Sequence, residues 1–160
     1  MRILTDIYDY VFVDIDDTLI HGWYIKLMHY TWKWFRNNTL SAILMYIQNK
    51  FNIYKVDEKL LYHLGYNSNN IIFLTVRAYS DATVEMVNKI MAKHNGAERT
   101  YCVIALGTDN GHEDKTKFIK HFFGEFKCLL IDDNIKNRYH AEANGIDTID
   151  PLTFREKLIW

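Results

Sequence analysis

The sequence is short of the residues that mark several classes of protein. Its two cysteines, Cys102 and Cys128, each lie inside an apolar run without metal-ligand spacing. We therefore expect two reduced core thiols, and neither a disulfide framework nor a zinc site. The chain has a single proline, and 49% of its residues are hydrophobic, a composition that argues against a disordered chain. The net charge of -1 argues against a strongly basic nucleic-acid surface, although a local basic patch is compatible with it.

Long hydrophobic stretches are also missing. The longest apolar run, residues 42–47, is far shorter than the roughly 20 residues that span a bilayer. Arg2, Asp6 and Asp9 interrupt the start of the chain, so no secretory signal is visible. We expect a soluble, cytoplasmic protein without a membrane span. Its 160 residues fit one domain.

Short runs rich in β-branched and aromatic residues recur along the chain, with stretches of helical spacing between them. These runs are Tyr10–Asp14, Ile71–Thr75, Tyr101–Ala105, Cys128–Asp132 and the weaker Ile146–Ile149. Strands that alternate with helices indicate a parallel sheet covered on both faces, and nearly continuous apolar character is typical of strands buried on both sides. The sequence therefore predicts an α/β fold, a three-layer sandwich around a parallel, Rossmann-like sheet.

Roughly fifty residues separate the first two runs, far more than a simple crossover needs. Helical spacing in 21–35, 40–49 and 57–64 predicts a small helical insertion at 21–65, between core segments 1–20 and 66–160. Basic residues are interleaved there with the aromatic residues Trp23, Tyr24, Tyr30, Trp32, Trp34, Phe35, Tyr46, Phe51 and Tyr54. These aromatic residues either pack inside a cap, form a homo-oligomer interface or stack on nucleic-acid bases, and the near-neutral charge favours the first two.

Oxygen-bearing side chains follow three of the predicted strands. The first strand ends in the segment DIDDT, which begins at Asp14, the second ends in Thr75, and the fourth ends in Asp132 and Asp133. Ligands of open parallel sheets bind beyond these carboxyl ends. Carboxylates that cluster there repel one another unless a cation is present, and their hard oxygen ligands favour Mg²⁺.

Asp14 and Asp16 are two positions apart, so on an extended backbone they lean to the same side. This spacing lets one carboxylate attack phosphorus while the other handles a proton. The segments VFVDIDDTL, IIFLT and LLIDDNIKN, with a lysine before the last, resemble the motifs of the haloacid dehalogenase-like phosphohydrolases. The resemblance runs from about Tyr10 to Ile149, outside the insertion.

The resemblance implies a magnesium-dependent phosphatase that hydrolyses a phosphomonoester through an aspartyl-phosphate. It makes Asp14 the nucleophile and a magnesium ligand. Asp16 becomes the general acid and then the base, and its backbone carbonyl also contacts the metal. A dehalogenase does not need an acid at this position, because halide leaves without a proton, so Asp16 favours phosphoester hydrolysis.

The same resemblance assigns the remaining site residues. Thr75 would hydrogen-bond the transferring phosphoryl group, and Thr18 would help to hold the loop. Asp133 would complete the magnesium site, with Asp132 beside it as a ligand or as support. Asn137 would orient that loop. Lys115 fits the motif lysine that neutralises the phosphoryl oxygens better than Lys117, which stays as the alternate.

Arg77 lies two residues after Thr75, and an arginine there resembles the phosphatases of nucleotides or polynucleotide ends. It either contacts substrate phosphate or caps a turn at the surface. The expected substrate is a phosphorylated small molecule or a nucleic-acid end. Two other functions stay open: a phosphotransferase that uses the same intermediate, and a non-catalytic binding or assembly protein that uses the aromatic insertion.

Overall fold

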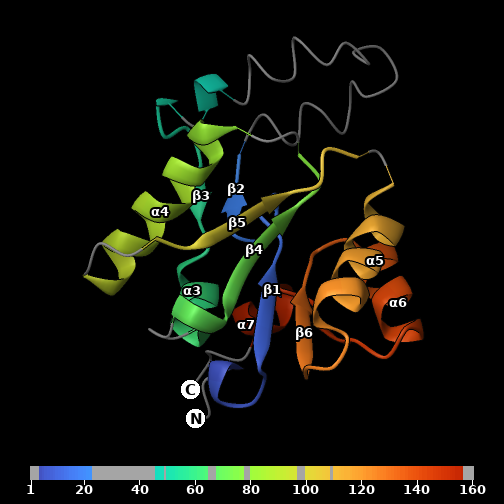
Figure 1. Cartoon of the computed structure of the whole chain (residues 1–160). Helices are drawn as coiled ribbons and strands as arrows, with labels where there is room; N and C mark the ends of the chain where they lie inside the picture. The colour runs from blue at the N-terminus through green and yellow to red at the C-terminus, as the bar shows by residue number, and fades with distance from the viewer. Residues whose placement is uncertain are drawn as a thin grey trace.

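The computed structural model of the chain describes residues 4–22, 46–48, 50–64, 68–77, 80–96, 100–108 and 110–156. Its centre is a parallel sheet of five strands in the order β5-β4-β1-β6-β7 (Figure 1). The strands are β1 (Tyr10–Val13), β4 (Ile71–Thr75), β5 (Cys102–Ala105), β6 (Cys128–Ile131) and β7 (Asp147–Ile149). The predicted α/β class and parallel sheet are confirmed, and each strand lies within one residue of its predicted bounds.

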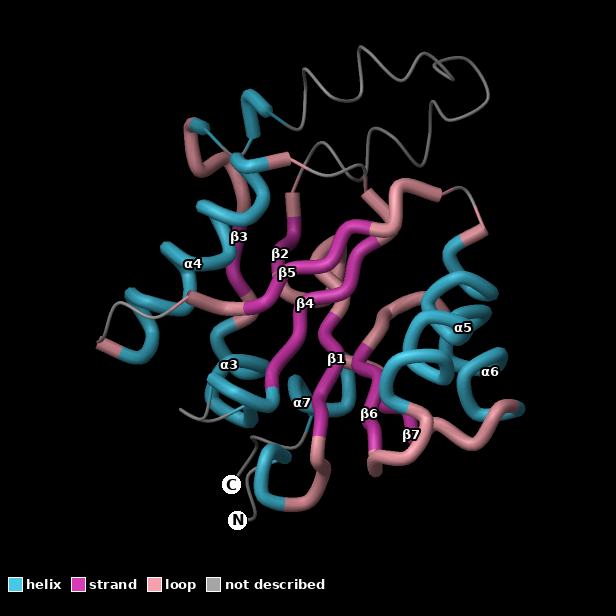
Figure 2. Tube along the Cα trace, in the orientation of Figure 1, coloured by secondary structure: helices cyan, strands magenta, loops and turns pink. Residues whose placement is uncertain are grey.

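Helices cover both faces of this sheet (Figure 2). They are α3 (Glu58–Leu64), α4 (Asp81–Asn95), α5 (Gly111–Phe123), α6 (Ile135–Ala143) and α7 (Leu152–Glu156), with 3-10 turns η1 (Leu4–Asp6) and η2 (Ser68–Asn70). One face packs against α3, α4 and α7, and the other packs against α5 and α6. Within the described ranges, none of these helices has the length and apolar character that crossing a membrane requires.

The central strand β1 supplies side chains to both faces of the sheet. Val11 and Val13 belong to the hydrophobic cluster on the α3, α4 and α7 side. Phe12 points the other way and packs in the cluster that contains Ile119 of α5 and Ala141 of α6. All three β1 side chains are fully buried, as expected of a strand covered on both faces.

The edge strand β5 is less buried than its apolar sequence predicts. Cys102 is exposed and the other three residues of the strand are only partly buried. Cys128, in β6, is buried, so the prediction of two core thiols is right for Cys128 and wrong for Cys102. The physical reason is position, because β5 has a neighbouring strand on one side only.

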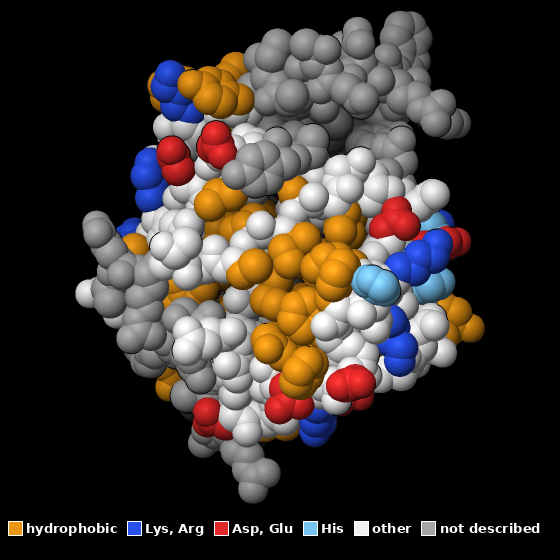
Figure 3. Space-filling view, viewed as in Figure 1, with side chains coloured by type: hydrophobic (Ala, Val, Ile, Leu, Met, Phe, Trp, Pro, Cys, Tyr) orange, Lys and Arg blue, Asp and Glu red, His pale blue; other side chains and the backbone are white. Residues whose placement is uncertain are grey.

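Hydrophobic side chains gather on the face of the molecule that looks toward the viewer in Figure 3.

A short two-stranded ribbon joins the start of the predicted insertion to a segment inside it. In it β2 (Ile20–His21) pairs antiparallel with β3 (Lys55–Val56), so His21 lies in a strand and not at the start of a helix. Helix α3 packs with the main sheet through its buried leucines. Residues 23–45, with most of the aromatic side chains of the expected cap or interface, lie outside the described residues.

Candidate functional site

The site lies where the order of strands along the chain reverses direction. From β1 the chain moves to β4 and β5 on one side, and then crosses to β6 and β7 on the other. Crevices beyond the carboxyl ends of strands at such a switch point bind ligands in open α/β sheets. Asp14 follows β1, Asp132 follows β6, and the Asp14 backbone N–H donates to the Ile131 carbonyl at 2.9 Å. Strand pairing therefore places the two acids side by side.

Helix α5 brings a lysine to these acids. A Cβ on its first residue, Gly111, would lie 2.5 Å from Val76 Cγ1, so glycine permits close packing against the segment after β4. One turn later, the Lys115 side chain is only 1% exposed, and its Nζ donates to Asp14 Oδ1 and to Asp132 Oδ2, each at 2.6 Å. Burial by itself would lower the pKa of Lys115, but the two carboxylates outweigh it and raise that pKa, so the ammonium stays charged.

Lys117, the alternate lysine, lies apart from this cluster. Its exposed Nζ pairs with Glu113 Oε2 at 2.8 Å across one turn of α5. Residues two positions apart on a helix lie about 200° apart around its axis. Because Lys115 faces the sheet, Lys117 has to face outward.

Asp132 is fully buried, and donors hold both of its carboxylate oxygens. Oδ1 accepts from the Asn134 backbone N–H at 2.9 Å and from Asn137 Nδ2 at 3.0 Å. Oδ2 accepts from Lys115 Nζ and from Asn137 Nδ2, the latter at 2.9 Å. Asn137, expected to orient the loop, is thus a direct partner of this carboxylate, and Asp132 itself positions the lysine.

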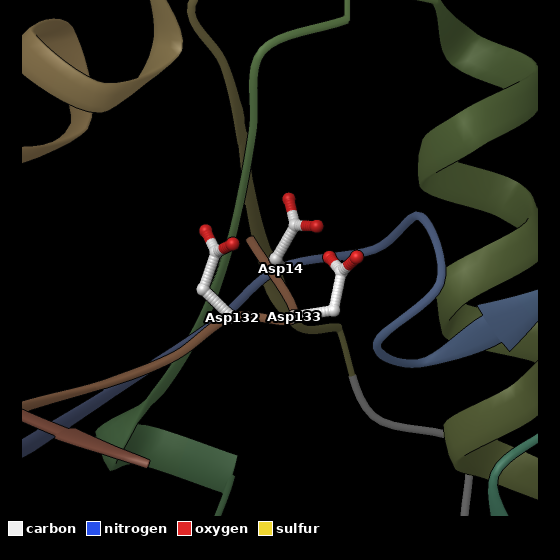
Figure 4. Close-up of side chains that lie close together, drawn as sticks. All are labelled: Asp14, Asp132 and Asp133. Carbon is white, nitrogen blue, oxygen red and sulfur yellow. The ribbon is translucent and has the colours of Figure 1, made fainter. Parts of the chain in front are cut away.

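Thr18 joins the loop after β1 to the loop after β6. Its buried hydroxyl accepts from the Asp133 backbone N–H at 3.0 Å and donates to Asp133 Oδ1 at 3.4 Å. Oxygens of Asp14, Asp132 and Asp133 all lie within 4.8 Å of one another. Figure 4 shows the three carboxylates pointing to the same side, with Asp14 between the other two. This acidic triad can hold a metal ion.

Burial and neighbouring carboxylates raise the pKa values of Asp14 and Asp133. Burial raises the pKa of Asp14 well above its usual range, the charges of Asp132 and Asp16 raise it further, and Lys115 opposes the change. Desolvation raises the pKa of Asp133 to about 6, with further contributions from the neighbouring Asp132 and Asp17. A bound cation would relieve this repulsion.

Asp16 and Arg77 form an ion pair beside the triad. The Arg77 side chain is 3% exposed, and its Nε and one terminal nitrogen contact both carboxylate oxygens of Asp16. The Arg77 backbone N–H donates to Oγ1 of the fully buried Thr75 at 3.3 Å. Arg77 was expected either to contact substrate phosphate or to cap a turn at the surface, and its burial excludes the surface cap.

Arg138 is a site residue that the sequence interpretation missed. It donates from one terminal nitrogen to the carbonyls of Asp132 and Asp133, at 2.6 and 2.8 Å, and its other nitrogen pairs with Asp150 Oδ2 at 2.7 Å. It thereby ties the acidic loop to the segment after β7.

No protein-family model matches this chain, and no curated protein or solved structure matches it either. The chain's own residues define the class: a Rossmann-like α/β protein with a parallel sheet. At the switch point it carries a buried lysine bridging two carboxylates, and an acidic triad able to hold a metal ion.

Proposed function

We propose that this chain is a magnesium-dependent phosphatase of the haloacid dehalogenase-like superfamily, which hydrolyses a phosphomonoester through an aspartyl-phosphate on Asp14. The observation that carries the proposal is the buried Lys115 ammonium, 2.6 Å from the Asp14 carboxylate at the end of β1. A fixed positive charge there reduces the repulsion between a carboxylate nucleophile and a phosphate dianion. The motif resemblance of the sequence supports the same roles.

The contacts of Asp14 divide its two oxygens between two tasks. Oδ1 accepts from Lys115, so Oδ2 is the oxygen that attacks phosphorus. The Asp14 O–P bond forms as the bond from phosphorus to the leaving oxygen breaks, and Asp16 supplies the proton for that oxygen. Asp16 then removes a proton from the water that hydrolyses the aspartyl-phosphate. Lys115 and the Thr75 hydroxyl hold the equatorial oxygens.

The donor set of the triad suits a hard divalent cation. Asp14 and Asp133 supply carboxylate oxygens, the ligands that Mg²⁺ prefers. Asp132 already accepts four hydrogen bonds from three donors, so its role is to support the site rather than to serve as the main ligand. The raised pKa values of Asp14 and Asp133 support the same fit. When bound, Mg²⁺ would supply charge that keeps both carboxylates ionised and attracts the phosphoryl group.

The proposed substrates are nucleotides, other phosphorylated small molecules and nucleic-acid ends. The narrower choice, a nucleotide or polynucleotide end, rests on the Thr75-Val76-Arg77 segment. Arg77 already pairs with Asp16, so any contact between Arg77 and phosphate has to share or replace that carboxylate.

The test measures phosphate release with Mg²⁺ from p-nitrophenyl phosphate, mononucleotides, sugar phosphates and a 3′-phosphorylated oligonucleotide. We expect turnover to vanish in Asp14→Asn and after addition of EDTA. Asp17→Asn is the matched control in the same loop, because Asp17 has φ of 54°, a conformation that asparagine also tolerates. An added alcohol that captures the phosphoryl group would indicate a phosphotransferase. Equal rates for wild type and Asp14→Asn would refute the nucleophile assignment.

A further inference from the structure

The Asp16 carboxylate lies between solvent and the buried Arg77 guanidinium, a group that can bind the oxygens of an anion. In their ion pair the Arg77 side chain is 3% exposed and the Asp16 side chain is 31% exposed. The carboxylate is thus the partner on the solvent side and the guanidinium is the partner in the interior. The contact uses Nε and a terminal nitrogen, one edge of the planar fork. That edge matches two oxygens of a carboxylate or of a phosphate equally well.

The backbone fixes Arg77 from both sides. Its N–H donates to Thr75 Oγ1 at 3.3 Å, and its carbonyl accepts from the Gly107 N–H at 3.0 Å, so the ends of β4 and β5 both hold it. Asp16 belongs to the loop after β1, and its charge acts on the buried Asp14 carboxylate nearby. If the pair separates, the more exposed Asp16 side chain is the one that turns away.

The geometry points to Arg77 as a phosphate-binding residue that Asp16 occupies until the phosphoryl group of the substrate displaces it. This inference rests on the proposed function, because it concerns the same phosphoryl group. A buried guanidinium is costly to leave without an anion, so phosphate can replace the carboxylate while Arg77 stays paired throughout. Displacement also frees the Asp16 carboxylate from the arginine, so that it can take up a proton from solvent and then pass that proton to the leaving oxygen. Substrate binding would thereby switch Asp16 from a counterion to a reacting group.

Competition between Asp16 and phosphate has a measurable consequence. Inorganic phosphate must displace the Asp16 carboxylate in the wild type, but it meets no competing charge in Asp16→Asn. We expect Asp16→Asn to bind phosphate on the order of tenfold more tightly, a change of about 1.4 kcal/mol. The gain should depend on Arg77, because that guanidinium is what the carboxylate occupies.

The experiment is calorimetric titration of inorganic phosphate, with Mg²⁺ at pH 7.5, into wild type, Asp16→Asn, Arg77→Met and the double variant. Asp17→Asn controls for the simple loss of one negative charge in the same loop, and it should bind within about twofold of wild type. The expected result is a gain in Asp16→Asn that the added Arg77→Met change abolishes. Equal binding by Asp16→Asn and the double variant, or no gain in Asp16→Asn, would overturn the inference.

Two provisions keep this test decisive. If circular dichroism shows that Arg77→Met does not fold, Arg77→Lys replaces it, because lysine keeps the charge but lacks the fork, and the gain should shrink. Phosphate binding also needs no turnover. A chain that releases no phosphate from any substrate refutes the proposed function, whereas wild-type turnover without a gain in Asp16→Asn refutes only the role of Arg77.

Discussion

Replacing Lys115 with methionine tests the central ion cluster directly. Methionine keeps the length of the apolar stem and removes the ammonium, leaving the carboxylates of Asp14 and Asp132 buried and facing each other. Removing one partner of a buried ion pair typically destabilises a protein by about 3–5 kcal/mol. We expect the free energy of unfolding of Lys115→Met to fall by about that amount at pH 7.5.

Protonation sets an upper limit to this loss. One of the two carboxylates can take up a proton on folding, which from an unfolded pKa of about 3.9 costs about 5 kcal/mol at pH 7.5 and about 1.5 kcal/mol at pH 5. The folded-state pKa of this acid is raised above the unfolded value, so the folded variant binds more protons. Stability then falls as pH rises. The difference between variant and wild type should therefore shrink between pH 7.5 and pH 5.

The assay is urea unfolding in EDTA, followed by circular dichroism at both pH values. With a urea slope near 2 kcal/mol/M, the loss at pH 7.5 corresponds to a midpoint lower by about 1.5–2.5 M. Lys117→Met is the matched control on the same helix, since this exposed lysine pairs with Glu113 across one turn, and its midpoint should stay at the wild-type value. Coincident midpoints for the two variants at pH 7.5, or a loss for Lys115→Met that is independent of pH, would refute the reasoning.

Two further predictions concern the acidic loop. Asn137→Ala removes a donor to both oxygens of the buried Asp132 carboxylate. The free energy of unfolding, measured by urea titration, should therefore fall by about 1.5–3 kcal/mol. Asn144→Ala, at an exposed position, is the control, and an equal effect of both changes would contradict the role assigned to Asn137. The pKa of Asp133, about 6 without a cation, makes Mg²⁺ binding compete with a proton below pH 6. The thermal shift that Mg²⁺ produces should be larger at pH 7.5 than at pH 5, and Asp133→Asn should reduce this difference, whereas a shift independent of pH would argue against Asp133 as a ligand.

The sequence predicts the strands well because each strand carries its own signal. A buried strand such as β4 needs five consecutive buried side chains, and the apolar run Ile71–Thr75 is visible without knowledge of its neighbours. The same signal does not encode the position of a strand in the sheet. Cys102 is therefore predicted to be buried and is found exposed, because only the strand order places β5 at the edge.

Some residues of the site are likewise predictable from the sequence, and others depend on the arrangement of the elements. The acids at the ends of β1 and β6 are predictable, because parallel strands bring their carboxyl ends to one edge of the sheet. The choice between Lys115 and Lys117 needs the start and rotation of α5, which Gly111 helps to set. The pairing of Asp16 with Arg77 joins residues 61 positions apart through two loops. Loop geometry of that kind has no periodic pattern in the sequence, so the sequence left Arg77 with two alternatives.

Charge balance is the strongest physical reason to place a divalent cation in the proposed site. The carboxylates at the ends of the strands are Asp14, Asp16, Asp132 and Asp133, and the cationic side chains that contact them are Lys115 and Arg77. These four carboxylates outnumber the two cationic side chains, and Asp17, whose charge also acts on Asp133, adds to the excess of negative charge. The Arg138 guanidinium does not reduce this excess, because it pairs with Asp150. Asp14 and Asp133 are the two of these acids whose pKa values are raised, first by burial and then by neighbouring carboxylates, and a cation there would stabilise the ionised form of both.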